Sequence, residues 1–349
     1  MKHLYILFAC VIPWGLMAQD PAQSQFFNQL HFANPAASGY IPGEMASRVS
    51  LFHRSQWAPL RMEAYQAMGV SFEHRWCLGN GHFWSLGGQV QRDGSRLGHW
   101  NNIRPQLMAS YHMDMDDGLY LAAGFQGGGL QTSFDPQNLR FDAQFTSTGY
   151  QSGASNGEDF ARTASLDYDL HAGLLLYHTR RQWTAGLALH HLNRPDYSFL
   201  TLADNTTPNR LDMGFTLHGS APLSTFDAVK KGRHWKGHLM LKKQSLTLRG
   251  RQTPDASSQQ WQLLLGVESR PLFKVSTGGF LRLAGSSPRG WLPDSFVWMF
   301  KVHTNDVQIG LSYDVLLSQL GFGNRHNGAL EVSLNVTFHQ YKKCVVCPH

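Results

Sequence analysis

The stretch DVQIGLSYDVL, from Asp306 to Leu316, alternates strictly between polar and apolar residues. The apolar positions are Val307, Ile309, Leu311, Tyr313 and Val315, and the positions between them are Asp306, Gln308, Gly310, Ser312 and Asp314. Because successive side chains of a β-strand point to opposite faces, this segment forms a strand with one apolar and one polar face. The fold class depends on whether that apolar face meets a protein core or lipid.

The same alternation recurs along the chain, whereas apolar residues at helical spacing are nearly absent. In the segment 330–338, for example, five apolar residues are separated by Glu331, Ser333, Asn335 and Thr337. We predict about fourteen strands, near residues 46–54, 64–76, 82–92, 102–113, 118–131, 166–178, 181–192, 210–220, 234–249, 260–270, 273–285, 295–303, 306–315 and 328–341.

The predicted connections alternate between shorter and longer, with 221–233 the one poor fit. Up-and-down barrels of the outer membrane have this asymmetry, with short periplasmic turns and longer outer loops. Lipid satisfies no backbone hydrogen bonds, so a sheet in a bilayer must close on itself. A soluble β-sandwich, the alternative, has no reason to sort its loops in this way. We therefore predict an all-β transmembrane fold, an antiparallel up-and-down β-barrel of the outer membrane.

The composition of the 349-residue chain excludes several other classes. No apolar run of helical-span length follows the first twenty residues, so we expect no transmembrane helix. Charged residues make up 15%, against about 25% in typical soluble proteins. The formal net charge is +6, but the Lys and Arg residues are scattered rather than gathered in one basic region. We therefore expect no nucleic-acid partner.

The N-terminus, MKHLYILFACVIPWGLMAQD, has a basic start followed by an apolar region and a small residue. This pattern predicts a secretory signal peptide over residues 1–18, cleaved between Ala18 and Gln19. A lipobox ending at Cys10 is an alternative that shortens the apolar region. We divide the rest into an N-terminal periplasmic segment at 19–45, a barrel at 46–341, and a basic C-terminal tail at 342–349 with a C-x-x-C motif.

Removal of the signal peptide leaves Cys77, Cys344 and Cys347. The pair Cys344 and Cys347 predicts a local disulfide in an oxidising compartment. Metal binding with His349 is the alternative, but a four-ligand zinc site needs a second pair of ligands, and the sequence has none.

After the signal peptide the chain reads QDPAQSQFFNQLHFANPAASGYIPGEMASRVSLFHRSQW. Together with the C-terminal end, this stretch resembles the PorP/SprF family, membrane proteins of the type IX secretion system of Bacteroidetes. The residues that carry the resemblance are Gln19-Asp20-Pro21, Ser24-Gln25-Phe26, Asn34-Pro35-Ala36 with Gly39, Arg54, Gln56-Trp57, Gly328, Glu331, Ser333 and Leu334, and more loosely Asp169, Gly173, His191-Leu192 and Pro195.

The resemblance implies an outer-membrane barrel that serves protein secretion and, in gliding bacteria, the secretion of surface adhesins. It implies contact with periplasmic ring components, lipoproteins among them, or with the C-terminal domain of a secreted cargo protein, besides the lipid of the outer membrane. No enzymatic activity, cofactor or small-molecule substrate goes with the family. The alternative from the residues alone is a passive porin or solute channel, because the polar strand faces permit a water-filled lumen unless the mature residues before the first strand or the long loop 132–165 fill it.

The motif Asn34-Pro35-Ala36 precedes the first predicted strand, on the periplasmic side. Asn before Pro is a turn former and resists helix. The motif therefore forms either a docking or plug element, or a turn that leads the chain into the barrel wall.

Arg54, Gln56 and Trp57 lie at the outer end of the first predicted strand. They form either a lipid-interface Trp with polar neighbours or a contact to cargo or lipopolysaccharide. Glu331 belongs to the lumen face of the last strand, where we expect it to pair with a basic residue in a structural network.

Catalytic motifs are missing from the sequence, which contains no H-E-x-x-H, no G-x-S-x-G and no phosphate-binding loop. His190 and His191 are neighbours in a predicted strand and should point to opposite faces, which makes them unfit to hold one metal ion. We therefore expect no enzyme and no catalytic, cofactor or metal site.

Overall fold

The computed structural model describes most of the chain. The described residues are 23–41, 43, 45–56, 65–95, 100–136, 139–147, 149–155, 163–196, 210–224, 235–248, 256–272, 274–286, 290–317 and 328–339.

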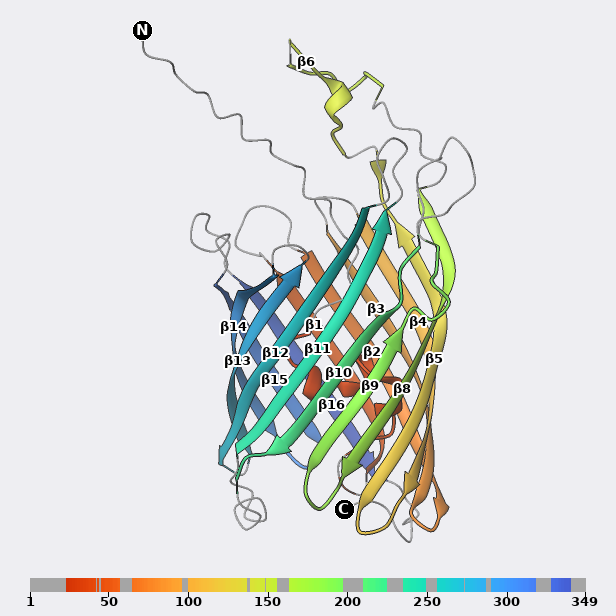
Figure 1. The fold of residues 1–349 in the computed structure, drawn as a ribbon, viewed down its shortest axis with the longest axis vertical. Helices are drawn as coiled ribbons and strands as arrows, with labels where there is room; N and C mark the ends of the chain where they lie inside the picture. Colours follow the sequence, from red (N-terminus) through yellow and green to blue (C-terminus); the bar gives the residue numbers. More distant parts are fainter. Residues whose placement is uncertain are drawn as a thin grey trace.

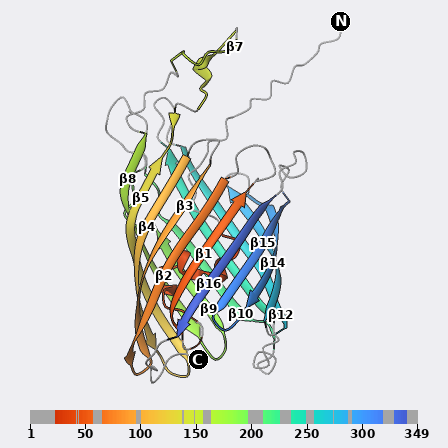
Figure 2. The same cartoon turned by 180° about the vertical axis from the view of Figure 1, so that it is seen from behind.

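Fourteen antiparallel strands form a closed barrel in which neighbours in sequence pair and the first strand pairs with the last (Figures 1 and 2). The predicted all-β barrel is thereby confirmed. The strands are β1 (Met45–Gln56), β2 (Tyr65–Gly79), β3 (His82–Ser95), β4 (Trp100–Asp114), β5 (Leu119–Ser133), β8 (Ala164–His178), β9 (Trp183–His190), β10 (Gly214–Pro222), β11 (Trp235–Leu248), β12 (Ala256–Leu272), β13 (Val275–Ser286), β14 (Gly290–His303), β15 (Val307–Leu316) and β16 (Ala329–His339).

Two strands extend further than the sequence indicates. β12 begins at Ala256 rather than near residue 260, and β14 begins at Gly290 rather than near residue 295. The added residues of β12 are mainly Ser and Gln, and Gly290 and Pro293 interrupt the alternation at the start of β14. In both strands the hydrogen-bonded ladder continues beyond the segment in which hydrophobic alternation is visible. The long connection after β5 also contains a 3-10 turn, η5 (Asp142–Gln144), and a small hairpin of β6 (Phe145–Thr146) and β7 (Gly149–Tyr150), which the sequence did not predict.

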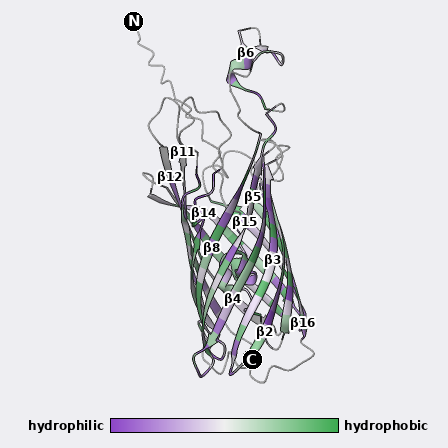
Figure 3. Cartoon of the chain, turned by 90° about the vertical axis from the view of Figure 1, so that its right-hand side faces the viewer, coloured by the Kyte–Doolittle hydropathy of each residue, from purple (hydrophilic) through white to green (hydrophobic). Residues whose placement is uncertain are grey.

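The apolar face of each strand points outward. In β15 the side chain of Ile309 is 51% exposed, whereas Asp314 on the opposite face is 1% exposed. Figure 3 shows this alternation along the strands as bands of hydrophobic and hydrophilic colour. Apolar residues outside and polar residues inside are the reverse of a soluble core and are the arrangement typical of transmembrane β-barrels. None of the described residues forms a helix that is long and apolar enough to cross a membrane.

The connections are short at one end of the barrel. They have two to four residues, except for 223–234 between β10 and β11. The turn between β2 and β3 uses Asn80 and Gly81, both with positive φ, as a tight two-residue hairpin requires. The opposite end carries the longest connections, 134–163 and 191–213.

Residues 23–41 lie inside the barrel and fill part of its lumen, where Figure 1 shows them as short red and orange turns. We call this segment the plug. It contains three single-turn 3-10 helices, η1 (Phe26–Asn28), η2 (Leu30–Phe32) and η3 (Pro35–Ala37). The prediction of a periplasmic location is wrong for these residues. A fourteen-stranded barrel encloses more space than the side chains of its wall can fill, and the plug occupies it.

Candidate functional site

The Asn34-Pro35-Ala36 motif begins η3 in the lumen. Asn34 is the N-cap of this turn, because its Oδ1 accepts a hydrogen bond from the backbone N–H of Ala36 at 2.9 Å. Its Nδ2 donates to the backbone oxygen of Leu174 at 3.0 Å and lies 2.9 Å from Nε2 of His218. The motif therefore joins its own turn to two strands of the wall, β8 and β10.

Two glycines in the wall make room for this motif. Gly124 of β5 pairs directly with Gly173 of β8. A Cβ atom on Gly124 would lie 2.4 Å from the backbone nitrogen of Ala36, and one on Gly173 would lie 2.0 Å from Oδ1 of Asn34. The plug can approach the wall this closely only because both wall positions lack a side chain.

A network of four buried charges lies where the plug begins. Arg54 donates to Asp314 at 2.7 Å and to Glu331 at 3.2 Å. Arg282 donates to Asp314 at 2.6 Å. The backbone N–H of Ser24 donates to Glu331 at 2.8 Å, and its hydroxyl donates to Asp314 and accepts from both arginines. Two positive and two negative groups balance here, and each makes hydrogen bonds to an oppositely charged partner and to Ser24.

Strand pairing brings these residues together. The register of β1 with β16 sets Arg54 directly opposite Glu331, and Ser312 of β15 is opposite Glu331 on the other side. The sequence expectation placed Glu331 on the lumen face beside a basic partner, and the structure has it there with Arg54. Arg282 and Asp314 were not singled out from the sequence. The sequence feature that could have identified them is a charged residue on the polar face of a strand whose polar and apolar residues alternate.

Arg54 does not face lipid or an outside partner. Its side chain is 2% exposed and points into the lumen, so the expected surface contact is wrong for this residue. Gln56 is half-buried, and in its flipped amide orientation it accepts from Arg54 Nε at 2.9 Å. Trp57 lies outside the described residues.

A second group of polar residues holds the middle of the plug. His31 is fully buried, with Nε2 2.7 Å from Oγ of Ser71 and Nδ1 3.1 Å from Nη2 of Arg48. Glu73 forms an ion pair with Arg48 and accepts from the backbone N–H of Gly39 at 2.8 Å. Burial lowers the pKa of His31 to about 4, with Glu73 opposing that shift and Arg48 adding to it. The imidazole is therefore neutral at pH 7.

Aromatic contacts fix the plug on its other side. The ring of Phe27 stacks on Phe280 with centroids 5.1 Å apart and lies 4.2 Å from the ring of His238. Nζ of Lys301 is 5.5 Å from the Phe27 centroid and 2.7 Å from Glu268. Phe27, His238, Glu268 and Lys301 line a cavity of about 500 Å³ that reaches the short turn at 304–306.

The two neighbouring histidines lie together. β9 ends at His190, and His191 has φ +56°, which breaks the alternation of the strand. Both side chains are buried, and the prediction that they point to opposite faces is wrong. Ligand atoms of His191, Asp169 and His171 lie within 4.8 Å of one another.

The remaining predicted sites lie outside the described residues. These are the cleavage site Ala18 and Gln19, and the pair Cys344 and Cys347. Cys77, near the end of β2, is disulfide-bonded. The Cys344–Cys347 bond stays a prediction.

The fold and the lumen together define a class, a transmembrane β-barrel whose own N-terminal segment occupies its interior through hydrogen bonds and ion pairs. The family described as "Type IX secretion system membrane protein PorP/SprF" matches residues 16–336. The chain belongs to this family, as the resemblance of its two ends indicated. No curated protein is similar enough to this chain to count as a match.

Solved structures share the fold at low sequence identity. A TodX monoaromatic hydrocarbon channel carrying the deltaS2S3 mutation is 10% identical, with a TM-score of 0.51, covering 90% of this chain and 94% of that chain. The CymD monoaromatic hydrocarbon channel is 11% identical, with a TM-score of 0.50 and the same coverage. A FadL homologue of Pseudomonas aeruginosa is 13% identical, with a TM-score of 0.50, covering 88% of this chain and 93% of that chain.

Proposed function

We propose that this chain is an outer-membrane component of the type IX protein secretion system. In this role it binds periplasmic ring components, lipoproteins among them, or the C-terminal domain of a secreted cargo protein, and in gliding bacteria it serves gliding motility. The observation that carries the proposal is the family match over residues 16–336. The signal peptide proposed at 1–18 provides the export that an outer-membrane location needs.

The occupied lumen supports a protein-binding role over free diffusion. The plug is held at three places along its sequence, by the charge network at Ser24, by the ion pair beside His31 and by the Asn34 turn. A segment held at so many points is not readily displaced by a small solute. Partners accordingly bind at the barrel ends or the outer surface, and no catalytic group is required.

Affinity purification from membranes in mild detergent tests this proposal. A C-terminally tagged chain should co-purify a periplasmic lipoprotein or ring component, or a cargo C-terminal domain, identified by mass spectrometry. A tagged outer-membrane barrel of unrelated function, expressed at the same level, is the control. Repeated isolation of the barrel with no such protein would contradict the secretion role.

A solute channel is the second candidate function. The cavity of about 500 Å³ beside Phe27 shows that the plug leaves space in the lumen, and two of the structural neighbours are named as monoaromatic hydrocarbon channels. Conductance in planar bilayers separates the two functions. The secretion role predicts no large, steady openings for the intact chain and openings after deletion of residues 23–41. Large, steady openings of the intact chain would favour the channel.

A further inference from the structure

We propose that Asp169, His171 and His191 form a binding site for a divalent transition-metal ion, with Zn²⁺ the ion that fits their chemistry. The site is separate from the charge network at Ser24. It lies in the barrel wall where β8 meets the end of β9.

Local backbone geometry assembles the three ligands. Asp169 and His171 are two residues apart on β8 and therefore share its lumen face. Regular alternation from the buried His190 would turn His191 toward lipid, but its left-handed φ of +56° directs it inward instead. The turn is held by Asn193, which accepts from the backbone N–H of Leu170 at 2.9 Å. A non-glycine residue at positive φ is uncommon, and here it serves to bring a third ligand to the pair.

The distances suit a metal ion. Nδ1 of His191 lies 2.9 Å from Oδ2 of Asp169, and Nε2 of His171 lies 3.1 Å from the same oxygen. Ligand atoms at about 2.0–2.1 Å from a tetrahedral Zn²⁺ are roughly 3.3 Å apart. The two distances to Asp169 are therefore within a few tenths of an ångström of that spacing, and all three ligand atoms lie within 4.8 Å of one another. Two imidazoles and one carboxylate are also a ligand set that zinc uses where it keeps one position open.

The charge of Asp169 gives an independent argument. Its side chain is fully buried, and among the described residues no Lys or Arg forms an ion pair with it. Its partners are the two histidines. An ionised carboxylate in the interior is costly unless a positive charge compensates it, and the other buried carboxylates described above have an Arg or Lys partner. A divalent cation supplies that charge at Asp169.

The hydrogen bonds of Gln106 also favour a cation beside Asp169. Its Oε1 accepts from Gln89 at 3.1 Å and from Gln126 at 2.7 Å, which fixes the orientation of its amide. The amide nitrogen therefore faces Nε2 of His171 at 2.8 Å, and that nitrogen presents its lone pair. The same nitrogen lies 3.1 Å from Oδ2 of Asp169, so one ring nitrogen faces both an amide N–H and a carboxylate oxygen and cannot satisfy the two at once. A cation bound to this nitrogen and to the carboxylate oxygen satisfies both atoms and takes the place of the Gln106 N–H.

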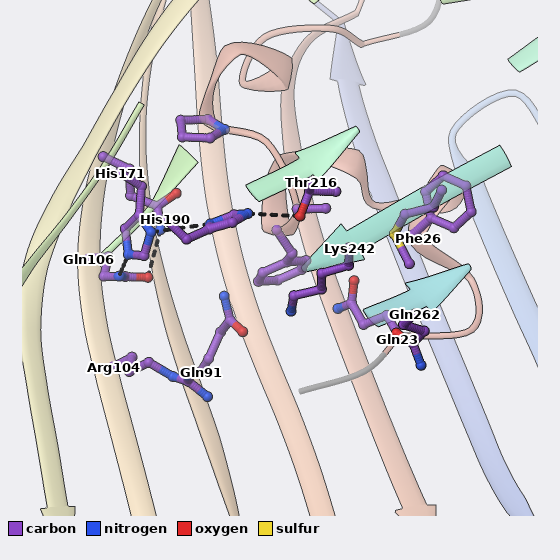
Figure 4. Close-up of a pocket in the computed structure, with 15 residues that line it drawn as sticks. Gln23, Phe26, Gln91, Arg104, Gln106, His171, His190, Thr216, Lys242 and Gln262 are labelled. Carbon is purple, nitrogen blue, oxygen red and sulfur yellow. Dashed lines mark hydrogen bonds between the residues drawn. The ribbon is translucent and has the colours of Figure 1, made fainter. Parts of the chain in front are cut away.

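The surroundings provide orientation and access. Nδ1 of His171 lies 3.3 Å from Nδ1 of His190, whose Nε2 lies 2.9 Å from the Thr216 hydroxyl. Metal-ligating histidines characteristically engage their second nitrogen in this way. His171 and His190 also line a small cavity of about 50 Å³ beside the plug (Figure 4). This is room for a water molecule near the open position.

Zinc titration tests the proposal. The detergent-purified protein, carrying Cys77→Ser, Cys344→Ser and Cys347→Ser so that no thiol is left in the expected mature chain, is treated with EDTA, desalted and titrated with ZnCl2. We expect one tightly bound zinc per chain by elemental analysis, and binding at least about 100-fold weaker in Asp169→Asn and in His191→Gln. His112→Gln is the matched control, because His112 is a buried lumen imidazole that contacts Ser38 and Tyr177 rather than a carboxylate. It should bind zinc as the parent does. Absence of stoichiometric zinc in the parent, or equal affinity in folded ligand variants, overturns the proposal.

X-ray absorption of the zinc-loaded parent protein gives a second measurement that does not depend on the folding of variants. We expect a shell of nitrogen and oxygen atoms at about 2.0–2.1 Å with imidazole scattering from two histidines. Performed on the chain with its natural cysteines, the same spectrum should show no sulfur shell. Sulfur at about 2.3 Å would place the ion on cysteines and contradict a site at Asp169.

Discussion

Arg54 and Glu331 are 277 residues apart in the chain, yet they lie opposite one another on β1 and β16 and form an ion pair of 3.2 Å. This is the strand pair that closes the barrel. The same Glu331 accepts the backbone N–H groups of Ser24 and Gln25 at 2.8 and 2.9 Å. One carboxylate thereby joins the first strand, the last strand and the start of the plug.

Replacing Glu331 by Gln should destabilise the barrel. The substitution preserves size but removes the charge that Arg54 faces, and breaking one partner of a buried pair costs about 3–5 kcal/mol. We expect a lower urea midpoint in micelles. Arg180→Gln is the control, because the Arg180–Asp117 pair is exposed and such pairs contribute less than about 1 kcal/mol. Equal midpoints for the two variants would contradict a stabilising role for the network.

Substitutions of Asn34 should loosen the plug. Asn34→Ala removes the cap of η3 and the hydrogen bond that Nδ2 donates to the backbone oxygen of Leu174, and the loss of these two hydrogen bonds costs about 1–3 kcal/mol. Asn34→Asp keeps a capping oxygen but turns a second acceptor toward Leu174, so it should not restore docking. Limited proteolysis of the folded barrel should cut the plug faster in both variants. Asn305→Ala, at an exposed turn, should match the parent. If the plug of Asn34→Asp resisted proteolysis as well as that of the parent, the cap of η3 alone would be sufficient to hold the plug in the lumen.

Gly173→Ala should also displace the plug. The new Cβ would lie 2.0 Å from Oδ1 of Asn34, so the motif must move away from β8. We expect openings in planar bilayers that the parent lacks. In Gly88→Ala the new Cβ meets its nearest neighbour, a side-chain carbon of Leu107, at 3.5 Å, an ordinary contact, so this variant serves as the control. Identical current traces for Gly173→Ala and the parent would show that the barrel wall moves to accommodate the new Cβ and that the plug stays in place.

The stability of the parent should decrease in mild acid partly because of His31. Its folded pKa of about 4 lies below the unfolded value of about 6.5, so the unfolded chain binds the proton first as the pH falls. The contribution of His31 to the free energy of unfolding is complete above about pH 6.5 and is lost toward pH 4, by about 3 kcal/mol at most. Urea midpoints of parent and His31→Gln, measured at pH 4.5 and 7, isolate this contribution. The difference between the two proteins should be smaller at pH 4.5. A difference independent of pH would show that His31 does not titrate in this range.

The alternation of polar and apolar residues was sufficient to predict the barrel strands, because lipid and lumen impose opposite demands on adjacent residues. It also placed Glu331 on the inner face. It did not identify the partners of Glu331, because Arg54 meets it only when the barrel closes, and Arg282 and Asp314 join through the stagger of neighbouring strands. His191 was misplaced because a single positive φ at the end of β9 reverses the direction of its side chain.

The sequence by itself determined a membrane barrel with short turns at one end, since period-two patterning is a local property of each strand. Only the tertiary structure decided that residues 23–41 enter the lumen rather than remain outside it. That segment has no alternation of polar and apolar residues from which its position could be predicted. Its position depends on hollows such as Gly124 and Gly173 and on acceptors such as Glu331, which come together only after distant strands have paired.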